Sequence, residues 1–240
     1  MATNLAGGVC IGQLNACVVR AARLDSDCTP TQGADGGIIT AGLATLTADP
    51  EIEEGTVFEP KNGCGDIMYT VTQADKIKRF NLTGEFLFFD YEMMALLFGG
   101  STILGRAAGA YNGKVIGHSM PLYSAAATNG VYLEVITQAV VEDAGDCVTA
   151  VGGAPAYIGH IFGKCRLTPG SRTFENDVAR VAFTGKATNN PSLYDGPWND
   201  YPGTGYVPNS AYSQVGYSAA EYAAILATVT CGYQTLPTGS

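Results

Sequence analysis

The sequence predicts a mainly β fold built from antiparallel strands, on three observations. Apolar and polar residues alternate along four clear stretches, as half-buried strands require. Hydrophobic residues make up 46% of the chain and charged residues only 15%, which is typical of an ordered, packed protein. Glycine accounts for 31 of the 240 residues, so turns are frequent and long helices are not expected.

The clear alternation predicts four strands, over residues 76–90, 131–142, 157–167 and 177–187. In the first of them, Phe80, Leu82 and Phe86 share one face, while Asn81 and Glu85 lie on the other. Weaker alternation predicts further strands at 16–24, 38–47 and 67–72. The stretches are separated by turn dipeptides such as Asn62-Gly63, Asn112-Gly113 and Asn129-Gly130.

Two short helices are expected beside the strands. Asp90 can cap a helix over residues 91–98, and Gly99 is suited to end it in the left-handed conformation. Near the C-terminus, Ser218 and Glu221 form a capping box, followed by apolar residues three and four positions apart. The sequence therefore predicts one helix at about 90–99 and a short terminal helix after Ser218.

We expect a β core over residues 1–187, followed by an extended C-terminal arm over residues 188–240 that is rich in Pro, Gly and Tyr. Within the core, an acidic loop is expected at about 46–62. The arm is too aromatic for a disordered tail, so its large side chains are expected to dock on a surface. These side chains are Tyr194, Trp198, Tyr201, Tyr206, Tyr212 and Tyr217.

The net charge of −9 is concentrated in one region of the chain. Residues 25–66 hold nine acidic side chains and a single basic one, Lys61. A protein that grips the phosphate backbone of duplex nucleic acid must bring positive charge to it. The sequence therefore argues against such a binder and indicates an acidic contact surface.

Catalytic and metal-binding patterns are scarce. His118, His160 and the seven cysteines include no pair with the spacing of a structural zinc site. Residues 117–121 (GHSMP) approach the nucleophile elbow of serine hydrolases but lack its final glycine. Adjacent carboxylates such as Glu53 and Glu54 have no apolar pocket pattern around them. We therefore expect no enzymatic activity, no metal and no cofactor.

The N-terminal residues show no basic segment followed by a long apolar run, so neither a signal peptide nor a membrane span is predicted. The seven scattered cysteines suit a reducing compartment and are expected to be mostly small core residues. Synthesis in the cytoplasm without a membrane partner is the expectation that follows.

Several segments, taken in order, resemble the major tail tube proteins of long-tailed bacteriophages, especially those of actinobacterial hosts. They are the acidic loop at 49–55 (DPEIEEG), the turn at 61–65 (KNGCG), the strand and helix at 81–100 (NLTGEFLFFDYEMMALLFGG), and the late segments at 183–191 (FTGKATNNP) and 196–202 (GPWNDYP). The resemblance spans about residues 15–205 and depends on the order of these pieces, none of which is a catalytic motif.

The resemblance implies an antiparallel β-sandwich or barrel of the tail-tube type with one flanking helix. Six such copies would close into a ring, and the rings would stack into a tube through which phage DNA passes without specific binding. The helix at 90–99 would pack on the sandwich, the loop at 46–62 would lie between rings, and the arm after Ala187 would reach a neighbouring subunit. The implied partners are further copies of the chain and the tape-measure, tail-terminator and distal tail proteins of the virion.

The acidic residues are expected to act in one of two ways. Acids on loops can meet basic residues of the next ring, and we favour this role for Asp49, Glu51, Glu53, Glu54 and Glu59. Their candidate partners are Lys76, Lys78, Arg79, Lys164 and Arg166. Acids on strands can instead line the lumen and repel DNA phosphates, for which the candidates are Glu85, Glu134, Glu175 and Asp177. The candidate contacts of the arm with a neighbouring subunit are Tyr194, Trp198, Tyr201 and Tyr206.

Two other classes of function remain as alternatives. A capsid decoration protein or adhesin module would bind a partner without forming tubes. An enzyme would need a compact pocket containing a titratable group with a perturbed pKa.

Overall fold

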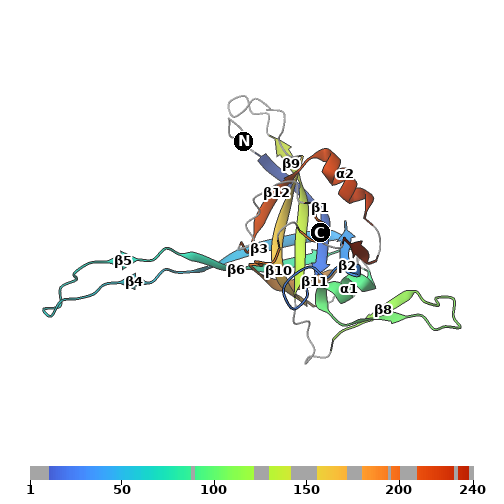
Figure 1. Ribbon diagram of the computed structural model, residues 1–240, viewed down its shortest axis with the longest axis horizontal. Coiled ribbons are helices and arrows are strands. Elements are labelled where there is room, and N and C mark those ends of the chain that lie inside the picture. The colour runs from blue at the N-terminus through green and yellow to red at the C-terminus, as the bar shows by residue number, and fades with distance from the viewer. Residues whose placement is uncertain are drawn as a thin grey trace.

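The computed structural model describes residues 11–87, 90–121, 130–141, 156–171, 180–193, 196–200, 210–229 and 232–237 (Figure 1). The fold of these residues is mainly β, and all pairings between the strands named below are antiparallel, as the sequence predicts. The strands are β1 (Ile11–Arg23), β2 (Gly33–Thr40), β3 (Leu43–Glu53), β4 (Val57–Phe58), β5 (Val71–Thr72), β6 (Lys76–Phe86), β7 (Ser101–Leu104), β8 (Val115–Ser119), β9 (Val131–Val141), β10 (Tyr157–Pro169), β11 (Val181–Thr188), β12 (Ser213–Tyr217) and β13 (Gln234–Leu236). The helices are α1 (Tyr91–Phe98) and α2 (Ala219–Ala227).

Nine of the strands form one sheet, in the order β13-β2-β1-β9-β10-β11-β6-β3 with β12 beside β10. Strands β11 and β12 lie end to end along one edge of β10, pairing with residues 164–169 and 157–161 respectively. Strand β3 ends this order, yet it packs against β1 near the opposite end. The sheet therefore folds over on itself around a core.

Strand β6 shows why the alternating sequence produces this sheet. Leu82, Gly84 and Phe86 are buried, while Thr83 between them is exposed. A Cβ added to Gly84 would lie 2.6 Å from both the Phe183 ring and the carbonyl oxygen of Thr45, so only glycine fits there. Phe86 and Phe183 stack beside it with ring centroids 5.1 Å apart. The alternation thus places one face of β6 in the core, as predicted.

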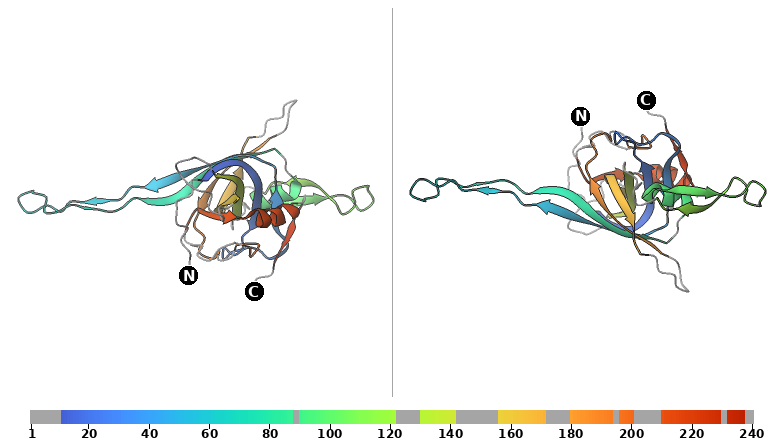
Figure 2. Two further views of the ribbon diagram at one scale, coloured as in Figure 1. Left: turned by 90° about the horizontal axis from the view of Figure 1, so that it is seen from above. Right: turned by 90° about the horizontal axis from the view of Figure 1, so that it is seen from below.

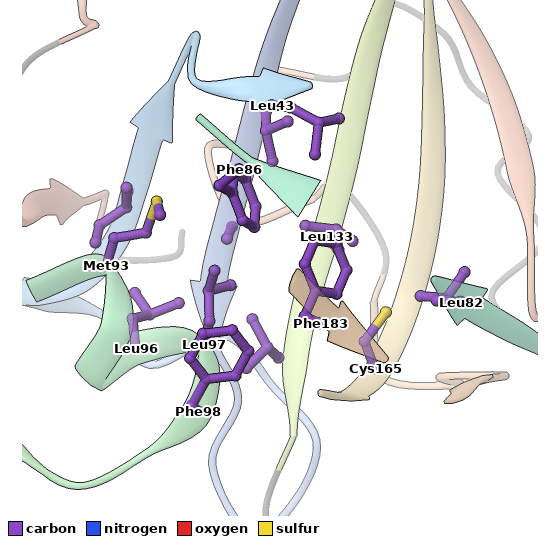
Figure 3. Packing of buried hydrophobic residues seen from close by; sticks show 14 of the residues in the cluster. Leu43, Leu82, Phe86, Met93, Leu96, Leu97, Phe98, Leu133, Cys165 and Phe183 are labelled. Carbon is purple, nitrogen blue, oxygen red and sulfur yellow. The ribbon is translucent and has the colours of Figure 1, made fainter. Parts of the chain in front are cut away.

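Helix α1 packs inside the folded-over sheet, and its predicted N-cap is confirmed. The Asp90 side chain accepts a hydrogen bond from the Met93 backbone N. Gly99 ends the helix at a positive φ of 77°, but its ψ of −170° lies outside the left-handed helical conformation that the sequence predicts. Figure 3 shows side chains of α1 converging with those of the strands. This main cluster includes Leu43, Leu82, Phe86, Met93, Leu96, Leu97, Phe98, Leu133, Cys165 and Phe183.

The described residues after Ala187 form part of the fold, which corrects the expected extended arm. They supply β12 to one edge of β10, β13 to the edge of β2, and helix α2, whose predicted Ser218–Glu221 capping box is present. They also bury the second face of the sheet through two smaller apolar clusters that include Leu193, Tyr217 and Ile225. The aromatic side chains of Trp198, Tyr212 and Tyr217 dock on a surface, as expected, and that surface belongs to their own chain.

The expected acidic loop at 46–62 is mostly strand. Residues up to Glu53 belong to β3, which pairs with β6 over its length, and the hairpin continues through β4 and β5. The predicted single strand at 38–47 is two strands, β2 and β3, with a break at residues 41–42. Alternating acids on an exposed strand resemble a polar loop because neither face of such a strand needs apolar residues.

Two hairpins leave the core. One is the continuation of β3 and β6 through β4 and β5, and the other is formed by β7 and β8. They extend in opposite directions in Figure 1 and in both views of Figure 2.

Candidate assembly surfaces

The longer hairpin extends well beyond the sheet, and we call its outer part, residues 54–75, the long arm. From Glu53 to the turn at Gly63 the chain adds about ten extended residues, or on the order of 30 Å. The long arm is exposed over nearly its whole length, including its large apolar side chains. These are Val57, Phe58, Ile67, Met68, Tyr69 and Val71, each between 49% and 65% exposed.

The tip of the long arm is ordered by its own polar groups. The side-chain Oδ1 of Asn62 accepts hydrogen bonds from the backbone N of Cys64 and of Asp66, both at 2.9 Å. Gly65 adopts a φ of 90°, which suits glycine. The predicted Asn62-Gly63 turn is therefore present. Cys64 at this tip is exposed, which corrects the expectation of a core residue, whereas Cys165 is buried as expected.

At the base of the long arm, Glu51 is already paired within its own chain. Arg79 donates to Glu51 Oε2 from Nε at 2.5 Å and to Oε1 from Nη2 at 2.8 Å. These hydrogen bonds lower the pKa of Glu51. The expectation that Glu51 and Arg79 contact another ring is therefore weakened, because the two side chains neutralise each other's charge between β3 and β6.

The other four acids of the predicted inter-ring group have no such partner. The side chains of Asp49, Glu53, Glu54 and Glu59 make no hydrogen bond or ion pair with the residues that the structure describes. Asp49 and Glu53 stand on β3, and Glu54 and Glu59 follow it into the long arm. The predicted role depended on a distinction between loop acids and strand acids, and this distinction does not hold for Asp49 and Glu53, which lie on a strand.

The second hairpin, residues 101–119, is here called the short arm, and sequence reasoning missed it. Its apolar residues Ile103, Leu104, Tyr111 and Ile116 are 44% to 63% exposed. Gly113, with a φ of 71°, helps to form its turn, where the Lys114 N donates to the Tyr111 carbonyl at 3.0 Å. The Asn112-Gly113 turn between two β-branched stretches was the available signal.

Exposed apolar residues are concentrated on these two arms. Of the fifteen large apolar side chains that are exposed in the described part of the chain, thirteen lie on the arms or directly beside them. Ile52 and Ile77 flank the long arm, and Met120 follows the short arm. Concentrated exposure of this kind is typical of surfaces that bind another molecule.

Beneath the C-terminal segment lies a buried ionic cluster centred on Arg20. Its Nε donates to Glu134 Oε2 at 2.8 Å and its Nη2 to the Tyr217 hydroxyl at 2.8 Å, while Nη1 pairs with Asp200. Glu134 also accepts from the hydroxyls of Tyr132 at 3.0 Å and Tyr217 at 2.7 Å. Arg20 and Glu134 are 1% and 0% exposed. The cluster therefore joins β1, β9 and β12 to the segment at 196–200.

The charged groups in this cluster stabilise one another electrostatically. Burial opposes the charged form of Arg20, but Glu134 and its other neighbours more than offset this effect and raise its pKa. Burial, and then Glu134, raise the pKa of Tyr217 well above its ordinary range. Trp198 covers the cluster, with its ring centroid 4.8 Å from the Arg20 Cζ. Arg20, a charged residue within the otherwise apolar stretch at 16–22, was the sequence signal for this site.

This cluster corrects two predicted roles. Glu134 is fully buried and cannot line a lumen, because the C-terminal segment covers the face of β9 that was expected to be open. Trp198 packs on Arg20 and, at a centroid distance of 6.2 Å, beside Tyr132 of its own chain, so it does not project towards a neighbour.

The remaining predicted residues are scattered. Glu85 lies on the outward face of β6 and forms an exposed pair with Arg180 at 3.3 Å. Lys164 donates to Cys28 Sγ at 2.9 Å, and Arg166 stands on β10. Lys76 and Lys78 are exposed on β6, at the base of the long arm. Glu175, Asp177, Tyr194, Tyr201 and Tyr206 lie outside the described residues.

The described residues offer neither a metal-binding cluster nor a helix that could span a membrane. They contain no group of three or more His, Cys, Asp or Glu side chains that could hold a metal ion. Neither α1, with eight residues, nor α2, with nine, is long enough to cross a membrane.

Comparison with known protein families finds none that matches this chain. A search of curated proteins likewise finds no match.

Proposed function

We propose that this chain is a major tail tube protein of a long-tailed bacteriophage, which closes into six-membered rings that stack into the conduit for DNA ejection. The sequence resemblance and the antiparallel, mainly β architecture with a short packed helix support this proposal. In this proposal the sheet that folds over around α1 is the tail-tube sandwich. The chain acts in the virion tail, where it meets tape-measure, tail-terminator and distal tail proteins.

The observation that carries the proposal is the pair of arms. Two-stranded hairpins are at best marginally stable in water when nothing packs against them. Both arms are nevertheless rich in half-exposed apolar side chains and project from opposite sides of one core. A chain that repeats in a ring or tube would cover both arms with neighbouring copies.

The exposed apolar surface is large enough to matter energetically. Burying the remaining half of one such side chain contributes about 1 kcal/mol. The six apolar side chains of the long arm would then contribute on the order of 6 kcal/mol, before the entropic costs of association are subtracted. Repeated around a ring, such contacts favour a closed assembly over a free monomer.

The acidic residues take two roles in this proposal. Asp49, Glu53, Glu54 and Glu59 lack partners among the described residues of their own chain and are available between rings. Glu85, on the outward face of β6, remains the described candidate for a lumen-lining acid. Acids that face the lumen would repel DNA phosphates and keep the passage free of adhesion.

Negative-stain electron microscopy of the purified protein tests the proposal. The matched variant replaces residues 54–75 with Asn-Gly, because Glu53 and Lys76 are directly paired and a two-residue turn can join them. We expect rings or tubes for the unmodified chain and folded monomers for the variant. Uniform monomers or trimers of the unmodified chain would overturn the proposal and favour a decoration or adhesin module.

A further inference from the structure

The two arms carry opposite charge. The long arm holds the four acids Glu54, Glu59, Asp66 and Asp75 against the single base Lys61, which gives −3. The short arm holds Arg106 and Lys114 and no acid, which gives +2 with His118 neutral. The rest of the chain has no comparable pair of oppositely charged, apolar projections among its described residues.

The charges at both arms are available for contact. Glu54 and Glu59 on the long arm, and Arg106 and Lys114 on the short arm, are exposed. None of these four charged side chains makes an ion pair or hydrogen bond with the described residues. Each arm also offers half-exposed apolar side chains beside its charges, so a contact between arms would bury apolar area and pair charges at once.

The two arms of one chain cannot meet each other. They leave the core in opposite directions, with the whole sheet between them (Figures 1 and 2). A contact between them therefore requires two copies in a head-to-tail arrangement, which continues from copy to copy. Contact between two long arms would instead bring like charges together.

We propose that the short arm receives the long arm of a second copy of this chain. Arg106 and Lys114 pair with the carboxylates of the incoming long arm, and Ile103, Leu104 and Tyr111 cover its apolar side chains. This inference rests on the proposed self-assembly and names the receiving surface within it. It also replaces the predicted basic partners Arg79, Lys164 and Arg166, which stand on the sheet, with two residues that project from it.

Charge reversal on each arm tests the pairing in the full-length protein. Sedimentation velocity over a range of concentrations measures the concentration at which half of the protein is assembled. The double variants Arg106→Glu/Lys114→Glu and Glu54→Lys/Glu59→Lys should each raise that concentration at least about tenfold. The chain with all four changes, and an equimolar mixture of the two double variants, should return to within about threefold of the unmodified protein.

A matched control reverses Lys76 and Lys78 to glutamate, which changes the net charge as much as reversal on the short arm does. We expect this control to assemble normally. Assembly of Arg106→Glu/Lys114→Glu at the original concentration, or failure of the four-change chain to recover, would overturn the arm pairing while leaving self-assembly intact. Absence of assembly in the unmodified protein would overturn both proposals.

Cross-linking provides a second readout. A carbodiimide joins an amine to a carboxylate that pairs with it, so an assembled mixture of ¹⁴N- and ¹⁵N-labelled chains reports contacts between copies. We expect mixed-isotope peptides that link Lys114 to Glu54, Glu59 or Asp66. Mixed-isotope links that join Lys76 or Lys78 to the long arm, with none from Lys114, would contradict the proposed surface.

Discussion

Replacing Arg20 with methionine should lower the free energy of unfolding by about 3–5 kcal/mol, because it leaves the carboxylate of Glu134 buried without its cation. Arg20 donates to Glu134, Tyr217 and Asp200 in the folded chain. The hydroxyls of Tyr132 and Tyr217 can still donate to Glu134, so we expect the lower part of that range.

Urea denaturation followed by tryptophan fluorescence measures this loss. The chain has one tryptophan, Trp198, and its ring lies over the Arg20 guanidinium, so the probe reports on the cluster itself. A loss of this size corresponds to a midpoint lower by roughly 1–2 M urea. The measurement belongs at several protein concentrations, since assembly would add apparent stability.

Two further variants separate the buried charge from simple loss of packing. The double variant Arg20→Met/Glu134→Leu removes both buried charges and should recover at least about half of the loss. Asp200→Asn should cost only about 1 kcal/mol, because the Asp200 side chain is 35% exposed. An Arg20→Met midpoint within about 0.3 M of the unmodified protein, or no recovery in the double variant, would refute the reasoning.

Four other results are expected. Burial lowers the pKa of His160 from its ordinary value of 6.5, so the unfolded chain binds more protons at this residue than the folded chain does. The free energy of unfolding should therefore fall as the pH drops below about 6.5. The variant His160→Gln should flatten this pH dependence in urea titrations. Gly84→Ala should cost about 1–3 kcal/mol in the same assay, since a Cβ has no room there. A thiol reagent should modify Cys64 in the native protein and Cys165 only after unfolding, because burial raises the pKa of the Cys165 thiol. Deleting residues 188–240 should abolish the cooperative transition seen by circular dichroism, and a folded remainder would contradict their place in the sheet.

Local patterns predicted the elements whose burial follows from their own sequence. Strand β6 alternates as a half-buried strand does, and Asp90 and Gly99 bracket α1 with capping residues that act within one turn. Each of these signals is contained in fewer than a dozen neighbouring residues. They need no knowledge of what packs above them.

Elements whose environment comes from distant residues were predicted less well. Glu134 alternates with apolar residues as a surface acid would, but the segment that buries it lies more than sixty positions later in the chain. The acids of β3 fit a loop equally well, because a projecting hairpin is exposed on both faces. The sequence predicted part of the long hairpin as a contact surface, because its acidic residues are concentrated there. It did not predict the short arm, which carries only two charged residues, Arg106 and Lys114.

The Arg20 cluster also affects the order in which the chain can fold during synthesis. Its cation belongs to one of the first strands, whereas Asp200 and Tyr217 leave the ribosome some 180 to 197 residues later. Until then Glu134 is the one carboxylate of the cluster that can pair with Arg20. Residues 157–161 of β10 also remain unpaired on the edge that β12 later covers. Contacts of such long sequence separation form slowly. The sheet is therefore expected to be completed in one of the last steps of folding. In that step the C-terminal residues that contain Asp200 and Tyr217 cover the Arg20 guanidinium, which was synthesised near the start of the chain.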